Sequence, residues 1–207
     1  MQDLREGAKF IKGSILLYTI LAAAVMGFAI EAASVNRPMF LEYHAGADGY
    51  VLFILMALIG GVAASYLVGM IGNKFDVGKL VFVLFMLAGV VRIAFTLVVP
   101  IQLVGALAIM VIYAALGTVV HIIFSSLNQK IPSKDMVGRV STISTTFIAI
   151  FVALGAFTGG FLGSIVPDAG HIFIYQGISY VVIGVLIIFV PSIRGLPKMN
   201  DIKKTGN

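Results

Sequence analysis

The sequence contains no cysteine, which excludes disulfides, thiolate chemistry and cysteine-based metal sites. It is also poor in charge, because only 11% of its 207 residues are Asp, Glu, Lys or Arg, whereas 60% are hydrophobic. Soluble domains carry about 25% charged and roughly 45–50% apolar residues. The scarcity of charge therefore excludes an ordinary water-soluble domain.

The sequence also lacks the short motifs that mark common enzyme sites. It holds no Gly-x-Ser-x-Gly nucleophile motif, no His-Glu-x-x-His metal motif and no phosphate-binding Gly-x-x-x-x-Gly-Lys-Ser/Thr. No aspartate falls within the long apolar blocks described below, which argues against aspartyl proteolysis inside a membrane. We therefore expect neither an enzyme nor a metal protein.

Six long apolar blocks dominate what is present. Each is close to the roughly 20 residues that an α-helix needs to cross about 30 Å of hydrocarbon. We predict an all-α, polytopic membrane protein with a bundle of six transmembrane helices over residues 15–190. The blocks cover residues 15–35, 51–71, 80–98, 103–124, 141–165 and 172–190.

Twelve of the fourteen Lys and Arg residues lie in the N-terminal segment, the second and fourth connections and the C-terminal tail. Of the other two, Arg37 is in the first connection and Arg92 is inside a block. Because positively charged short loops stay in the cytoplasm, both termini are predicted to be cytoplasmic. The net charge of +5 is spread over loops that face one leaflet, so lipid head groups rather than nucleic acid are its expected partners.

Two short segments flank the predicted bundle. Residues 1–14 alternate apolar with charged side chains, a pattern typical of a helix that lies at the cytoplasmic interface. Residues 191–207 are basic and contain proline and glycine, so we predict a solvated cytoplasmic tail.

Glycine is frequent in the predicted spans, and 23 glycines occur in the chain. Gly155 and Gly159 form a small-xxx-small pair on one face of the fifth span. Helices pack closely in lipid where small residues let their backbones approach. Helix packing is the main interpretation of this pair, and a sliding surface in a conformational cycle is the alternative.

Three segments carry a family resemblance. Residues 3–11 (Asp-Leu-Arg-Glu-Gly, then Phe-Ile) resemble the stretch before the seventh helix of bacterial major facilitator superfamily exporters. Residues 72–79 resemble the second copy of the cytoplasmic Gly-x-x-x-Asp-Arg-x-Gly-Arg-Arg loop of these exporters. Residues 129–141 resemble the loop between their tenth and eleventh helices. The branch is that of macrolide-efflux-like and siderophore-exporter-like permeases. The matching loop residues are Gly72, Asp76, Gly78, Lys79, Gly138 and Arg139, whereas Val77 replaces the arginine of the motif.

The resemblance implies a secondary active transporter in the bacterial cytoplasmic membrane that exports small organic molecules or drugs with an ion gradient and without a bound cofactor. Members have twelve helices in two halves, with the substrate path between the halves, whereas this chain resembles the second half alone. A truncated gene, a split gene or a partial chain would each account for this. The expected partner is a second six-helix half or a second copy. The competing interpretation is a non-transporting membrane remnant or an assembly partner.

The matching loop residues have two interpretations. Asp76 would accept hydrogen bonds from basic neighbours or face a helix N-terminus, and so hold the cytoplasmic side closed; the alternative is a solvated acid worth about 0–1 kcal/mol. We expect Gly72 and Gly78 to occupy tight turns that need positive φ. Arg139 is interpreted mainly as a topology determinant, with a gate role as the alternative.

Three ionisable residues lie within or near the spans, where a charge is costly and usually functional. Glu31 and His121 fall on the first and fourth spans, which line the central cavity in the family, and each is a candidate for proton coupling or substrate contact. The alternative for Glu31 is contact with interfacial water or an ion pair with Arg37. The alternative for His121 is a hydrogen bond to a neighbouring helix. For Arg92, on a span that is peripheral in the family, we predict a structural or snorkelling role. Further lining candidates, which ordinary packing explains equally well, are Met26, Phe28, Tyr113 and Phe124.

Overall fold

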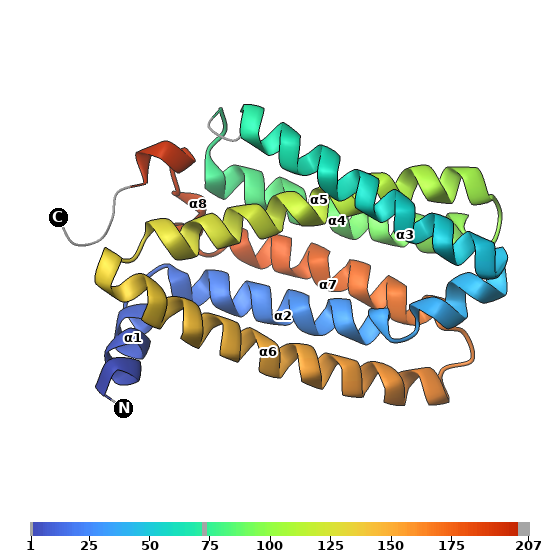
Figure 1. Ribbon diagram of the computed structural model, residues 1–207, viewed down its shortest axis with the longest axis horizontal. Coiled ribbons are helices and arrows are strands. Elements are labelled where there is room, and N and C mark those ends of the chain that lie inside the picture. The colour runs from blue at the N-terminus through green and yellow to red at the C-terminus, as the bar shows by residue number, and fades with distance from the viewer. Residues whose placement is uncertain (1, 72–73, 203–207) are drawn as a thin grey trace.

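The regular elements of the protein are all helical in the computed structural model, which describes residues 2–71 and 74–202. Within these residues, six helices are long and apolar enough to cross a membrane. They lie side by side, and α1 and α8 lie at the same end of the bundle, called the N/C end below (Figure 1). The elements are α1 (Gln2–Lys12), α2 (Leu16–Ser34), α3 (Arg37–Ile71), α4 (Val77–Val98), α5 (Leu103–Lys130), α6 (Lys134–Ile165), α7 (Gly170–Ile188), α8 (Pro191–Arg194) and the 3-10 helix η1 (Met199–Asp201).

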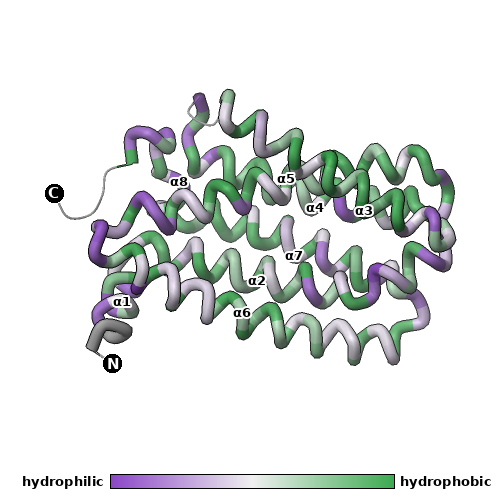
Figure 2. The backbone as a smooth tube through the Cα atoms, in the orientation of Figure 1, coloured by the Kyte–Doolittle hydropathy of each residue, from purple (hydrophilic) through white to green (hydrophobic). Residues whose placement is uncertain are grey.

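Hydrophilic residues gather toward the two ends of the bundle, and apolar residues dominate its middle (Figure 2). This distribution places the middle of α2–α7 in hydrocarbon and the connections in the head-group regions or water. The prediction of an all-helical protein with six candidate membrane spans is confirmed. The assignment of the N/C end to the cytoplasm stays a prediction.

The helices extend beyond the apolar blocks at several places. The predicted outer connection, residues 36–50, is helical for most of its length: α3 begins at Arg37 and is interrupted at Gly46, whose φ is 71°. At the N/C end, α4 begins at Val77 and α6 begins at Lys134, so the fourth connection is much shorter than residues 125–140. Apolar runs mark only the part of a helix that lies in hydrocarbon, because polar residues continue the same backbone hydrogen bonds outside it.

Glycine residues bring the most extensively packed helix pairs together. The pairs are α2 with α6, α4 with α7, and α3 with α5. A Cβ atom on any of these glycines would overlap a backbone carbonyl of the partner helix, which explains their place at the contacts. The packing interpretation of the small-xxx-small pair agrees with this geometry. The glycines are Gly155 and Gly159 on α6, Gly89 on α4, Gly177 on α7 and Gly60 on α3.

Buried apolar side chains form two clusters. One lies toward the N/C end and includes Leu16, Val81 and Leu127, whereas the other lies toward the far end and includes Phe53 and Phe173. Large apolar side chains also cover much of the outer surface. In lipid such exposure carries no penalty, so both the inside and the outside of the bundle are apolar.

The described part of the tail packs against the bundle, which corrects the prediction of a solvated tail. Ile193 and Leu196 are buried and belong to the cluster at the N/C end. The backbone N–H of Val77 donates to the carbonyl of Pro197 at 3.2 Å, and Lys130 Nζ donates to the carbonyl of Met199 at 3.0 Å. The tail contains enough apolar residues to join the core despite its basic composition.

Candidate functional site

A cavity of about 350 Å³ lies between α2, α4, α5 and α7, with one residue of α3 at its wall; we call it the α2/α5 cavity. Its volume is in the range of small-molecule sites, about 300–1,000 Å³. Apolar residues make up most of the wall. The polar lining residues are Arg37, Tyr113, Thr118, His121 and Tyr180, and the apolar ones are Met26, Ile30, Phe85, Ala88, Met110, Ala114, Gly117 and Val120.

Two larger grooves exist but lack converging polar groups. One, of about 550 Å³, lies between α2 and α7, and the other, of about 630 Å³, lies between α3, α4 and α5. Their walls are almost entirely aliphatic or aromatic. Such grooves suit lipid chains, whereas a ligand site combines apolar walls with a few placed polar groups. The α2/α5 cavity is therefore the better candidate.

Helical spacing explains how α5 supplies so much of the cavity wall. Met110, Tyr113, Ala114, Gly117 and His121 fall at positions i, i+3, i+4, i+7 and i+11, so they form one stripe along the helix. The face of α2 contributes Met26 and Ile30 in the same way. The two spans that the sequence singled out therefore do meet at one cavity.

A buried polar network stands behind the cavity wall at Arg92. Arg92 on α4 is 1% exposed, and its Nε donates to Gln176 Oε1 on α7 at 2.7 Å. Gln176 Nε2 donates to the hydroxyls of Tyr113 and Tyr180 at 3.0 and 3.1 Å, and these hydroxyls lie 3.2 Å apart. The network thus joins α4, α5 and α7 through side chains far apart in the sequence.

Three aromatic rings surround the guanidinium of Arg92. Its Cζ lies 4.4 Å from the ring centre of Phe173, 5.0 Å from that of Tyr113 and 5.2 Å from that of Phe95. Each contact of this kind contributes about 0.5–2 kcal/mol to the stability of a desolvated cation. The buried position excludes snorkelling, because the side chain ends among the rings instead of at the membrane surface. Of the two roles predicted for Arg92, structural or snorkelling, the structural role therefore remains.

The other candidates within the spans differ in their placement. His121 lines the α2/α5 cavity and is exposed, whereas Glu31 is half-buried and lies outside the lining, although its neighbour Ile30 lies within it. Within the described residues, neither Glu31 nor Arg37 forms an ion pair, so the predicted Glu31–Arg37 pair is not present. Of the four further lining candidates, Met26 and Tyr113 line the cavity, and Phe28 and Phe124 do not.

Sequence reasoning missed the importance of Arg37, Gln176 and Tyr180. Arg37 was assigned to an outer connection, yet its side chain lines the cavity and its Nε is buried. Gln176 is a polar residue inside an otherwise apolar block, and this was the signal that could have identified it. No local signal distinguishes Tyr180 from a tyrosine that packs against lipid.

The predicted gate loop at residues 72–79 lies at the N/C end. Gly72 is outside the described residues. Asp76, the residue before α4, forms an ion pair at 3.2 Å with Lys79 in the first turn of that helix, and their side chains are 42% and 79% exposed. Such a pair contributes about 0–1 kcal/mol. Among the described residues this ion pair reaches no other helix, so it does not close the bundle in this conformation.

Gly78 has a different role from the predicted one. It lies in the first turn of α4 and its φ is not positive, which corrects the expectation of a tight turn. A Cβ atom there would overlap the backbone carbonyls of Ile193 and Arg194, and the N–H of Gly78 donates to the carbonyl of Leu196 at 3.4 Å. Glycine is thus required because the tail backbone approaches α4 closely.

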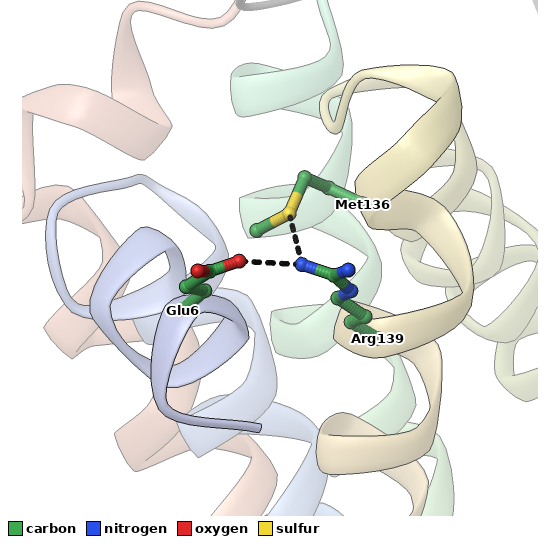
Figure 3. A network of polar contacts seen from close by, with 3 residues as sticks. All are labelled: Glu6, Met136 and Arg139. Carbon is green, nitrogen blue, oxygen red and sulfur yellow. Dashed lines mark hydrogen bonds and ion pairs between the residues drawn. The ribbon is translucent and has the colours of Figure 1, made fainter. Parts of the chain in front are cut away.

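Arg139 connects α6 to α1. Arg139 Nη1 lies 2.6 Å from Glu6 Oε2 and 4.0 Å from Met136 Sδ (Figure 3). A Cβ atom on Gly7 would be too close to Ile143, so α1 lies tightly against α6 at this point. The neighbouring Gly138 is exposed and has open space around it. Gly138 and Arg139, which were predicted to lie in a loop, are therefore both in helix α6, where Arg139 pairs with Glu6 of the N-terminal helix.

No protein-family model matches this chain, and no curated protein or solved structure matches it either.

Proposed function

We propose that the chain is one six-helix bundle of a secondary active transporter of the major facilitator type, which moves small organic molecules across the cytoplasmic membrane with an ion gradient. The observation that carries this proposal is the α2/α5 cavity. It is lined by the first and fourth spans, which the family resemblance assigns to the substrate path, and it combines apolar walls with Tyr113, Thr118 and His121. Transporter sites of this type lie near the bilayer midplane at the interface of two bundles.

A second bundle completes the proposed transporter. Alternating access moves one bundle against another around a shared site, and the structure described here contains one bundle. Polar and ionisable groups such as His121 are costly against lipid, so a protein surface covering them is favoured. The second bundle is a separate chain, a second copy or another part of a longer polypeptide.

The test is export from proteoliposomes with and without a second bundle. Export driven by a pH gradient is expected only when the second bundle is present. Efficient export by a demonstrated monomer of this bundle would contradict the two-bundle mechanism. Absence of transport in every combination would favour the alternative, a non-transporting assembly partner.

The role of the ionisable residues is tested separately in a transport-competent assembly. If His121 carries the coupled proton, His121→Asn abolishes export driven by the pH gradient but retains substrate exchange at equal pH. Glu31→Gln is expected to behave in the same way only if Glu31 carries it instead. His171→Asn is the matched control, because His171 is exposed and lies outside the α2/α5 cavity. Unchanged coupling in both test variants would remove both residues from the coupling mechanism.

A further inference from the structure

Two positive charges are concentrated at the α2/α5 cavity. Arg37 lines it, and the guanidinium of Arg92 lies behind Tyr113, with its Cζ 5.0 Å from the centre of that ring. No acidic side chain is among the lining residues. The ion pairs formed by the described residues, at Asp76 and at Glu6, lie at the N/C end of the bundle. Among the described residues, these two cations therefore form no ion pair, and no carboxylate lines the cavity.

Both guanidinium groups retain hydrogen-bond donors that the protein does not use. Within the described residues, Arg37 Nε and Arg92 Nη2 are buried and have no acceptor. Leaving a buried donor unpaired costs roughly 1–3 kcal/mol, and more for a charged group. Aromatic rings and Gln176 accommodate the charge of Arg92, whereas within the described residues the guanidinium of Arg37 lies over no aromatic ring.

A tyrosine hydroxyl is a further donor for a ligand. Tyr113 and Tyr180 both accept from Gln176, and only one of their two hydroxyl protons is needed for the contact between them. Both residues line the cavity. The second hydroxyl proton can therefore be donated to a group in the cavity, on the same side as the buried cations.

We propose that the α2/α5 cavity binds the acidic head group of an amphipathic organic anion. Arg37 holds the head group, a tyrosine hydroxyl donates to it, and Arg92 adds positive charge from behind Tyr113. The apolar body of the ligand lies along Met26, Ile30 and Met110, and the flexible thioethers of the two methionines adapt to different shapes. The inference deepens the proposed function, because it names the chemical class of the substrate, and it rests on that function only for the transport step.

The test is binding of 2-naphthoate to the full chain in nanodiscs of zwitterionic lipid, with 2-naphthamide as the neutral isostere and empty nanodiscs as the blank. The chain contains no tryptophan, so the emission of the naphthalene probe is read without tryptophan background. We expect naphthoate to bind at least about tenfold more tightly than naphthamide. Arg37→Gln should remove this preference and leave naphthamide binding unchanged, whereas Arg37→Lys should retain part of it.

Two further variants separate the site from general effects. Gly117→Phe should block both probes, because Gly117 lines the cavity and has open space for a side chain. Arg194→Gln should change neither, because Arg194 is an exposed cation outside the cavity. Equal affinities for the two probes, or naphthoate binding that survives Arg37→Gln, would overturn the inference.

The source of the anion is identified by adding phosphatidylglycerol to the nanodiscs. If this lipid competes with naphthoate, the acidic group is a lipid head group; if it does not, the ligand is a soluble organic acid. The outcomes also separate this inference from the transport proposal. Selective naphthoate binding by a bundle that never transports would overturn transport alone, whereas a transporting assembly that binds both probes equally would overturn anion recognition alone.

Discussion

The packing of α6 on α2 makes a sharp prediction about two adjacent glycines, Gly159 and Gly160. A Cβ atom on Gly159 would overlap the backbone of Ala32, whereas a Cβ atom on Gly160 would meet nothing within 4 Å. Gly159→Ala should therefore push the helices apart, while Gly160→Ala should not. Both substitutions add the same methyl group to the same helix.

The magnitude follows from two effects at Gly159. Overpacking of a tight contact costs about 1–3 kcal/mol. The carbonyl of Gly159 also accepts a hydrogen bond of 2.9 Å from Asn36 Nδ2, and separation of the helices would weaken a bond of this kind, which is worth about 0.5–1.5 kcal/mol. We expect Gly159→Ala to lower the free energy of unfolding by about 1.5–4.5 kcal/mol. Gly160→Ala should leave it unchanged or raise it by up to about 1 kcal/mol through helix propensity.

The assay is reversible unfolding by dodecyl sulfate in mixed micelles, followed by far-ultraviolet circular dichroism. The quantity compared is the difference between the two alanine variants, which cancels the general effect of an added methyl group. Equal stability of the two variants would refute the close approach of α6 to α2. A larger loss in the Gly160 variant would place the wrong face of α6 at the contact.

Three other predictions concern the ends of the bundle. Single cysteines at Ser133 and Asp168 should react with impermeant thiol reagents from opposite sides of the membrane, with Asp168 outside; labelling from one side only would refute the six-span topology. Gly78→Val should detach the tail from α4, and trypsin should then remove the basic tail faster than from the unaltered chain; an unchanged rate would show that the contact does not hold the tail. The Glu6–Arg139 pair is partly exposed. A double-mutant cycle with Glu6→Gln and Arg139→Gln should therefore give a coupling energy of only about 0.2–1 kcal/mol. A coupling energy of several kcal/mol would contradict the expectation that this exposed ion pair contributes little to stability.

The six spans were predictable because the thickness of the hydrocarbon sets the length of an apolar run, and this property is local. The ends of the helices were not, since α3 starts at Arg37 in polar sequence and α6 includes Arg139. The loop motif correctly drew attention to Gly78 but for the wrong reason. Glycine is needed at position 78 because the backbone of residues 193–194 lies against it, and this contact could not be predicted from residues so far apart in the sequence.

The sequence by itself determined an all-helical chain with six helices long and apolar enough to span a membrane, and it placed Glu31, Arg92 and His121 in or near them. Only the tertiary structure decided what surrounds these residues. Gln176 lies 84 positions from Arg92 yet accepts its hydrogen bond, and Arg37 reaches the cavity wall from the start of another helix. The physical reason is that transfer of a segment into lipid depends on its own composition, whereas pairing of helices within lipid has no hydrophobic drive and depends on the fit of surfaces distant in sequence.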